Sequence, residues 1–450
     1  MYRQIDLDIL RKNIDNIKDE AMKKKLDTLE PTMKEFNEVY DVILDYIKKK
    51  RRIIYGGFAQ NHLIEIKNKY DSFYKDLDLA DVEFYSYEPL TDVVEMCDLL
   101  HSKGYKYVQG SEGAHPETYK IFVNFINYCD ISYMPKNVHD NMPYIDSKGL
   151  RFANPHFMLV DAFRVYSDPL TSYFRLDKTF NRFSVLMRYY PFDEKHSKNK
   201  IIYDTKLSNE QLEQIKHFVR HEILHHSQFI IVGHYAYNYL VKKVNLGLEF
   251  ENFNYYQAIS INYLEDRNNV EKHLKEKYKN DITVKHFVPF FQFLDYRTEY
   301  FYKDVCILKL YGHNNRCIVN NFSEKKKVFF GTFQLIFLYL LADYQFAITR
   351  RDQREQNNFM IMITRLLAAR EKYLDSHDLT ILDKSPFQEF TLQCLGSTED
   401  PLRQSRIDQR KRKDEGKMIV FRYDPTGKPG RVPEFRFNNT SGNEITNKKK

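Results

Sequence analysis

A fourteen-residue pattern occurs twice in this chain. RIIYGGFAQNHLIE at 52–65 and FIIVGHYAYNYLVK at 229–242 are identical at six of fourteen aligned positions, with an offset of 177 residues. Each copy contains a β-branched run, a glycine and a stretch with helical periodicity, which predicts a strand, a tight turn and a helix. A structural unit that recurs at this distance indicates two related domains in one chain.

The segment from 50 to 135 alternates short apolar runs with a helical pattern, which is typical of an α/β (α+β) domain. Two amphipathic helices separated by Pro31 are expected before it, and Asn154–Pro155 and Asp168–Pro169 are start signals for a helical middle region. Within the α/β segment we expect strands at 82–85, 107–108, 121–126 and 131–133, and a helix at 90–102.

Carried forward without gaps, the repeat pairs Asp81–Phe84 with Ala258–Ile261, so apolar positions stay apolar while both acids disappear. The second copy is therefore expected to keep the fold and to have lost the acids and their chemistry, although two unrelated strand–helix units remain an alternative. The resulting plan has an N-terminal helical segment at 1–50, the first α/β domain at 51–150, the helical middle region at 151–205, the degenerate second copy at 206–397 and a basic flexible tail at 398–450.

Composition excludes several classes of protein. At 450 residues with 42% hydrophobic and 29% charged residues, the chain is an ordinary globular protein of more than one domain. Its five cysteines are scattered without a CxxC pair, so we expect neither a disulfide framework nor a cysteine–zinc module, and a reducing compartment. We expect no membrane segment and no secretory signal, because the most apolar run, 329–342, is shorter than a bilayer span and is interpreted as a buried helix.

Positive charge is concentrated at the C-terminal end. Residues 398–450 contain 14 Lys and Arg against 8 Asp and Glu, a net charge of +6 out of +7 for the whole chain. Such a segment either binds polyanions or is simply a solvated tail that keeps the protein soluble.

The first copy of the repeat carries a set of acids suited to metal-dependent transfer of a nucleotide. The backbone of Gly56 and Gly57 can approach a triphosphate, because no Cβ stands in the way. Asp81 and Glu83 alternate along a strand and point to one face, and Asp130 begins another strand that supplies a third carboxylate. These three residues are the candidate ligands of two divalent ions, Mg²⁺ or Mn²⁺.

A competing acidic pair precedes them. Asp76 and Asp78 lie on the opposite parity, which in a continuous strand is the face of Val82 and Phe84. The repeat marks that face as core, so parity favours Asp81 and Glu83 as the metal ligands and leaves the other pair as the alternative.

Three cations recur in the middle region at helical spacing. Arg175, Lys178 and Arg182 would form one stripe on a helix that begins after Asp168–Pro169, and such a stripe can bind phosphates. The competing interpretation is a solvated basic face paired with Asp177 or Glu194.

Residues 50–345 resemble the catalytic subunits of poly(A) polymerases of large cytoplasmic DNA viruses, those of giant amoebal viruses in particular and, more distantly, those of poxviruses. The residues that carry the resemblance are YGGFAQN at 55–61, DLADVEFYS at 78–86, NYCDISYMP at 127–135, NPHFMLVDAFRVYSDPLTSYFRLDKTFNR at 154–182, IVGHYAYNYL at 231–240 and HNNRCI at 313–318.

The resemblance implies a polymerase-beta-like nucleotidyltransferase domain, a helical middle domain and a degenerate nucleotidyltransferase-like domain. It also implies template-independent addition of AMP from ATP to the 3′-hydroxyl of single-stranded mRNA, in the host cytoplasm or the virion. Matching motif positions makes Asp81, Glu83 and Asp130 catalytic, and Gly56, Gly57 and Asn61, with the stripe of Arg175, Lys178 and Arg182, nucleotide-binding. Glu83 is a departure, since related transferases often have a second Asp there.

Other functions stay open. His221, Glu222 and His225 spell HExxH, the zinc-protease pattern, with Glu249 as a third ligand by spacing, but the two histidines fall on the polar side of their helix. A non-catalytic RNA-binding or assembly protein would explain the basic tail, and another RNA 3′-end nucleotidyltransferase would use the same acids. A homodimer is expected, since two copies could lengthen one RNA groove.

Overall fold

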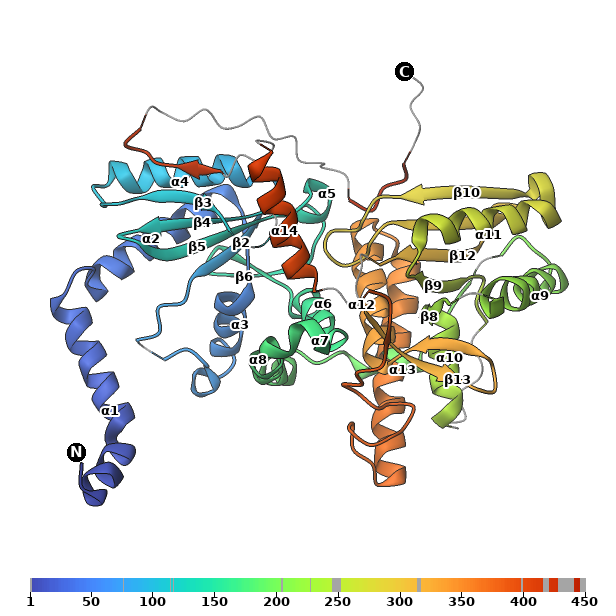
Figure 1. Cartoon of the computed structure of the whole chain (residues 1–450), viewed down its shortest axis with the longest axis horizontal. Helices are drawn as coiled ribbons and strands as arrows, with labels where there is room; N and C mark the ends of the chain where they lie inside the picture. Colours follow the sequence, from blue (N-terminus) through green and yellow to red (C-terminus); the bar gives the residue numbers. More distant parts are fainter. Residues whose placement is uncertain are drawn as a thin grey trace. The chain divides into compact units, whose positions relative to one another are not determined.

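The computed structural model describes residues 2–445 except 76, 114, 116, 204, 227, 245–251, 314–316, 398–399, 416–420 and 428–440. The chain forms two compact units (Figure 1). The first contains Met1–Met134, Tyr144–Ala153 and Val420–Phe437, and the second contains Pro135–Pro143, Asn154–Ile419 and Asn438–Lys450.

Two helices precede the first sheet, as the sequence predicts: α1 (Gln4–Thr28) and α2 (Met33–Lys50). Thr32 caps α2 by accepting a hydrogen bond from the Glu35 N–H. The apolar face of α2 is buried, and Phe36 packs on Tyr128 of the sheet with ring centroids 5.2 Å apart. In α1, by contrast, Leu26 alone is buried.

The first sheet has eight strands in the order β16-β3-β4-β5-β2-β1-β7-β6. The β1–β7 and β2–β5 pairs are parallel and the other neighbours are antiparallel. Helix α3 (Gly56–Glu65) follows β1, and α4 (Pro89–Ser102) packs on β3, β4 and β5. The strands are β1 (Ile53–Tyr55), β2 (Val82–Ser86), β3 (Gln109–Glu112), β4 (Thr118–Val123), β5 (Ile126–Tyr133), β6 (Tyr144–Ser147), β7 (Leu150–Ala153) and β16 (Arg422–Tyr423).

Two strand predictions in this sheet are wrong. The strand expected at 107–108 begins at Gln109, because Tyr107 has a left-handed backbone with φ of 50°. The run expected as one strand at 121–126 is a hairpin that turns at Asn124 and Phe125, both with positive φ. Apolar residues at these turns continue the hydrophobic pattern of a strand. The pattern contains no information on the backbone dihedral angles that end the strand.

The second unit contains the helical middle region and a second sheet. Its helices are α5 (Lys136–His139), α6 (Pro155–Tyr166), α7 (Pro169–Ser172), α8 (Leu176–Tyr189), α9 (Asn209–Phe218), α10 (Gly233–Val244), α11 (Tyr263–Tyr278), α12 (Phe333–Thr349), α13 (Gln353–His377) and α14 (Pro401–Asp414). Its strands, in the order β10-β11-β12-β9-β8-β14-β13-β15, are β8 (Ile230–Val232), β9 (Tyr256–Ser260), β10 (Ile282–Phe287), β11 (Arg297–Tyr302), β12 (Val305–Gly312), β13 (Ile318–Ser323), β14 (Val328–Gly331) and β15 (Cys394–Leu395).

The apolar run at 329–342 divides between β14 and α12, and α12 is buried on nearly all sides. It packs on α6, where the rings of Phe163 and Phe337 lie 4.5 Å apart. Over the described residues, no helix combines the length and hydropathy that crossing a bilayer requires.

The two sheets share one topology, which confirms the internal repeat. Strands β8, β9, β12, β11, β10, β14 and β13 take the places of β1, β2, β5, β4, β3, β7 and β6, and the parallel pairs recur at β8–β14 and β9–β12. The ungapped pairing of the second strands is wrong, however. Glu83 lies opposite Tyr55, and Gln257 lies opposite Val232, so Gln257 and not Ser260 corresponds to Glu83. The connection is three residues shorter in the second copy, 25 instead of 28.

The scattered cysteines predict no disulfide framework, yet one disulfide bond forms. Cys317 and Cys394 are bonded, although 77 residues separate them. The pairing of β13 with β15 brings their Cα atoms within 5.2 Å, a contact that spacing in the sequence does not reveal. Cys97, Cys129 and Cys306 are free thiols.

The C-terminal segment expected to be a flexible arm contributes defined elements to both units. Helix α14 belongs to the second unit. Strand β16 extends the first sheet by pairing with β3, and the Tyr423 hydroxyl donates to Asp98 at 2.5 Å. Residues 416–420, 428–440 and 446–450 of this prediction lie outside the described residues.

Polar side chains are buried at the centre of the second unit. His234, 3% exposed, places Nδ1 3.2 Å from the amide oxygen of Gln257. The Gln257 amide nitrogen donates to Asp343 at 2.6 Å and to the Tyr311 hydroxyl at 3.1 Å. Burial, assisted by the charge of Lys309, lowers the pKa of His234 to about 3.

This low pKa predicts a pH-dependent stability of the second unit. The pKa of a histidine in an unfolded chain is near 6.5. Between that pH and about 3, the unfolded chain binds a proton at this histidine and the folded chain does not. The free energy of unfolding therefore falls as the pH falls. We expect the wild type to lose about 1 kcal/mol per pH unit more than His234→Gln between about pH 6 and 5, measured by urea unfolding. His273→Gln, at an exposed position, is the control. Equal slopes for wild type and His234→Gln would contradict the prediction.

Candidate active site

The turn between β1 and α3 is a close approach of backbone to side chain. Gly56 has φ of +69°, and a Cβ built on it would lie 1.9 Å from the Glu83 Oε2 atom on β2. The Gly57 N–H donates to the same Oε2 at 2.7 Å. The Glu83 carboxylate therefore lies at the positive N-terminal end of α3, which requires glycine at position 56.

Two of the three predicted acids lie on neighbouring strands, and the third directly precedes one of them. Glu83 on β2 lies directly opposite Asp130 on the parallel strand β5. Asp81 precedes β2, and its Oδ2 lies 3.3 Å from the side-chain nitrogen of Asn127, which also donates to Asp130 at 2.9 Å. Lys120, opposite Asp130 on β4, donates to both oxygens of that carboxylate, at 2.6 and 2.7 Å.

The carboxylates do not converge in this arrangement. Among the described residues, no three His, Cys, Asp or Glu side chains are grouped closely enough to hold a metal ion. Glu83 accepts a hydrogen bond from the Gly57 N–H, and Asp130 is paired with Lys120. The sequence did not single out Lys120 or Asn127; Asn127 stands at the start of the motif that contains Asp130, whereas the role of Lys120 depends on cross-strand pairing.

The donor set nevertheless fits divalent cations. Its members are carboxylates, the oxygen ligands that Mg²⁺ and Mn²⁺ prefer. The side-chain nitrogen of Asn127 contacts Asp81 and Asp130, whereas the oxygen of the same amide is buried without a hydrogen-bond partner. A buried oxygen without a partner is costly, and a bound cation is one kind of partner that would satisfy it.

The alternative acidic pair does not lie on a continuous strand. Strand β2 begins at Val82, and Asp78 is exposed in the preceding turn, where its Oδ2 accepts from the Lys75 N–H at 2.8 Å. The parity argument therefore does not extend back to it. Asp76 lies outside the described residues. As predicted, Val82 and Phe84 are fully buried.

Asn61 anchors a loop. Its oxygen accepts from Ser72 Oγ and from the Phe73 and Tyr74 N–H groups at 3.0–3.1 Å, and its nitrogen donates to Glu65 at 2.9 Å. All polar atoms of this buried side chain are thus used in holding residues 72–74, and a direct role with nucleotide stays a prediction.

The basic stripe lies in the second unit. Lys178 is exposed on α8, Arg182 is half-buried one turn later, and Arg175 ends the turn that precedes the helix. Asp177, a proposed partner for the stripe, accepts instead from Asn181 at 3.0 Å. Binding of phosphates by these three cations stays a prediction.

The second copy repeats the steric contact without the acids. Gly233 has φ of +63°, and a Cβ on it would lie 2.0 Å from the amide oxygen of Gln257. Register places Lys309 where the first copy has Asp130, and Glu299 where it has Lys120. The ion pair is therefore reversed in direction, with Lys309 Nζ 3.9 Å from Glu299.

Lys309 keeps its charge in the interior. Burial alone would lower the pKa of Lys309, but Glu299 and Glu355 raise it above its usual value. A cation at this position would repel a divalent metal at the place where the first copy has Asp130.

Comparison with known proteins decides the family. Residues 41–172 match the family described as "Poly(A) polymerase catalytic subunit", and residues 184–450 match "APMV, Putative poly(A) polymerase, catalytic subunit, C-terminal". A protein of Acanthamoeba polyphaga mimivirus, "Putative poly(A) polymerase catalytic subunit", is 32% identical over 99% of this chain and 83% of its own length. This chain belongs to the viral poly(A) polymerase catalytic subunit family.

Two further comparisons agree. A crystal structure of the Megavirus polyadenylate synthase superposes with a TM-score of 0.92 at 31% identity, covering 99% of this chain and 93% of that one. A protein of African swine fever virus with the same printed description as the mimivirus relative is 28% identical over 35% of this chain and 34% of its own length. The resemblance noted from the sequence is confirmed, and the chain is a nucleotidyltransferase.

The HExxH segment of this polymerase subunit lacks the features of a zinc site. His221 lies in a π-helical turn, Val219–Ile223, and its Nε2 accepts from the Arg220 guanidinium at 3.1 Å. Burial, together with Arg220 and His217, lowers the pKa of His221. Glu249 lies outside the described residues, and among the described ones no group of three His, Cys, Asp or Glu side chains could hold a metal ion.

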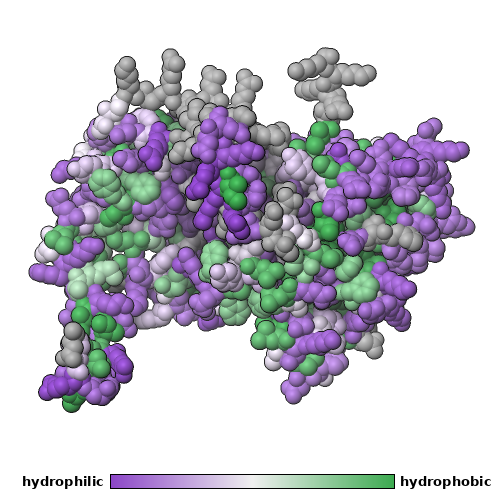
Figure 2. All heavy atoms as spheres, in the orientation of Figure 1, coloured by the Kyte–Doolittle hydropathy of each residue, from purple (hydrophilic) through white to green (hydrophobic). Residues whose placement is uncertain are grey.

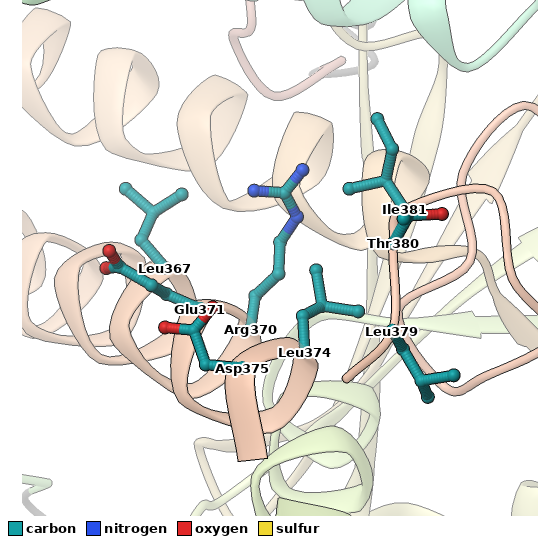
Figure 3. Close-up of a pocket in the computed structure, with 8 residues that line it drawn as sticks. All are labelled: Leu367, Arg370, Glu371, Leu374, Asp375, Leu379, Thr380 and Ile381. Atoms are coloured by element: carbon teal, nitrogen blue, oxygen red, sulfur yellow. The ribbon is translucent and has the colours of Figure 1, made fainter. Parts of the chain in front are cut away.

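A cavity of about 590 Å³ lies in the second unit. Helix α13 and the segment after it line it, with Arg370, Glu371 and Asp375 among mostly apolar neighbours (Figure 3). Its lining contains no residue that the sequence assigned to nucleotide binding.

Gly56→Ala and Gly233→Ala form a matched pair that separates folding from chemistry. Each forces a Cβ into a left-handed turn against a side chain, so each should destabilise its unit by at least about 1–2 kcal/mol in urea unfolding. Under conditions where both variants are folded, we expect polymerase activity to be lost in Gly56→Ala and kept in Gly233→Ala. Equal loss of activity in both folded variants would contradict this assignment.

Lys120→Ala should alter the metal dependence of the polymerase. Lys120 competes with any cation for Asp130, so its removal should lower the Mg²⁺ concentration that gives half-maximal activity by about threefold or more. The exposed Lys106→Ala is the control. Loss of activity at every Mg²⁺ concentration would show instead that Lys120 acts on the substrate.

Proposed function

We propose that the first unit transfers AMP from ATP to the 3′-hydroxyl of single-stranded RNA without a template. The observation that carries this proposal is the contrast between the two sheets: one position holds Glu83 opposite Asp130, and the equivalent position holds Gln257 opposite Lys309. In a chain of the poly(A) polymerase family, the copy that keeps its carboxylates is the copy that reacts. The preference for ATP follows from family membership.

Asp81, Glu83 and Asp130 would hold two divalent ions, Mg²⁺ or Mn²⁺. When bound, such ions activate the attacking hydroxyl and stabilise the departing pyrophosphate. The chain itself positions these carboxylates. The Gly57 N–H at the start of α3 holds Glu83, and Lys120 balances the charge of Asp130 until a cation replaces the lysine.

The helical middle region would bind the triphosphate through Arg175, Lys178 and Arg182. Arginine and lysine bind phosphate oxygens by charge-assisted hydrogen bonds. The net charge of +6 on residues 398–450 would contribute to RNA affinity in the same way. We further propose that the enzyme acts as a homodimer, in which two copies lengthen one path for RNA, and that it works in the host cytoplasm or the virion.

Glu83→Gln is the sharpest test of the site, because it turns the first copy into the second at one position. Glutamine keeps the shape and can still accept the Gly57 N–H, so the fold should survive. We expect activity to fall at least about 100-fold, roughly 2.7 kcal/mol of transition-state stabilisation. The assay is extension of a labelled single-stranded RNA with each NTP separately, in Mg²⁺ or Mn²⁺.

Two controls accompany this variant. Gln257→Glu should neither add activity nor restore it to Glu83→Gln, since Lys309 still repels metal. Asp78→Asn should leave activity unchanged, because that side chain is exposed in a turn. Full activity of Glu83→Gln would overturn the proposed site, and equal use of all four NTPs would favour another RNA 3′-end nucleotidyltransferase.

A further inference from the structure

Helix α1 projects from the first unit (Figure 1), and apolar side chains lie on its surface (Figure 2). Ile14 and Ile17 near its centre are 45% and 46% exposed, and Leu26 is its one buried residue. A helix of 25 residues with large apolar side chains in water is poorly stabilised by its own contacts.

The apolar residues of α1 follow the spacing of a coiled coil. Leu7, Leu10, Ile14, Ile17 and Ala21 are separated by three, four, three and four residues, which is the a/d pattern of a heptad repeat. This row, from Leu7 to Ala21, is called the seam below. Ile5 and Ile9 lie off the seam, on the other side of the helix.

The two edges of the seam carry opposite charges. With Leu7 at position a, the e positions are Arg11, Lys18 and Lys25, all basic. The g positions are Asp6, Asn13, Glu20 and Asp27, all acidic or neutral. Residues at e and g flank the contact between two helices and decide which partner and which direction are accepted.

This charge pattern favours pairing with a second copy of the same helix, and it favours the parallel over the antiparallel orientation. In a parallel pair, a g residue faces the e residue five positions later on the other helix, so Asp6 would face Arg11 and Glu20 would face Lys25. Because the pair has two-fold symmetry, each of these ion pairs forms twice. In an antiparallel pair, e faces e and g faces g, which brings like charges together.

Existing contacts within α1 do not prevent this pairing. The ion pairs Arg3–Asp6 at 2.8 Å, Arg11–Asp8 at 3.5 Å and Lys18–Asp15 at 3.2 Å are exposed and join residues three apart. Exposed pairs of this kind contribute little and exchange readily.

We propose that α1 pairs with α1 of a second copy of this chain as a short parallel coiled coil that joins two polymerase subunits. This inference rests on the homodimer proposed above and is independent of the chemistry of the active site. The seam spans about two heptads, too short to hold two chains alone, so its contribution has to be measured in the full chain.

Charge exchange across the seam is the test. Variant A, Asp6→Lys/Glu20→Lys/Asp27→Lys, makes both edges basic, and variant B, Arg11→Glu/Lys18→Glu/Lys25→Glu, makes both edges acidic. We expect each alone to dissociate at least about ten times more readily than wild type in sedimentation equilibrium, and a mixture of A and B to form heterodimers at wild-type strength. Circular dichroism confirms folding, and a control triple changes the outer positions Lys12, Asp15 and Asp19 to alanine.

A cysteine pair reports direction. Leu7→Cys, near one end of the seam, should give disulfide-linked dimers under mild oxidation, since parallel pairing brings the two Leu7 positions together, while Lys12→Cys on the outer side should not. A dimer that neither A nor B weakens, or that Leu7→Cys fails to link, overturns the pairing of α1 and leaves the homodimer standing. A monomeric wild type overturns both, and RNA extension measured in parallel tests the polymerase proposal separately.

Discussion

The two sheets of this protein depend on one steric contact, in which the glycine after the first strand lies against a side chain of the neighbouring strand. Gly56 meets Glu83 in one sheet, and Gly233 meets Gln257 in the other, with no room for a Cβ in either. The contact fixes where the following helix begins and directs its first N–H groups over the strand. The second sheet keeps the glycine although Gln257 replaces the glutamate. The requirement for glycine after the first strand is therefore set by packing and not by the catalytic reaction.

Duplication preserved an ion pair while reversing it. Lys120 and Asp130 in the first sheet correspond in register to Glu299 and Lys309 in the second. Either orientation neutralises two charges between neighbouring strands, so both satisfy the fold. The two orientations differ in the ligand that they can bind. An aspartate such as Asp130 can bind a metal cation, whereas a buried lysine such as Lys309 repels one. The second sheet thus keeps the topology of the first and carries the opposite charges at the positions that correspond to Lys120 and Asp130.

The sequence predicts a large part of this architecture. The repeat, the α/β class, the helices around Pro31 and the buried strand residues Val82 and Phe84 follow from periodicity and local signals. What it misses depends on pairing between strands. The shorter connection to Gln257, the approach of Lys120 to Asp130 and the bond between Cys317 and Cys394 are set by contacts between residues far apart along the chain. A hydrophobic pattern carries no information on such contacts.

Strand β16, near the C-terminal end of the chain, completes the sheet of the first unit. The backbone passes between the two units after residues 134, 143, 153, 419 and 437, and its return places β16 along the outer edge of β3. An uncovered edge strand is a template for aggregation, so two residues, Arg422 and Tyr423, shield a sheet whose other strands precede residue 154. The units are therefore not interchangeable modules. A chain truncated after the second sheet would lack β16 and would leave the outer edge of β3 unpaired. The first unit, which carries the acids, therefore depends on the last thirty residues of the chain.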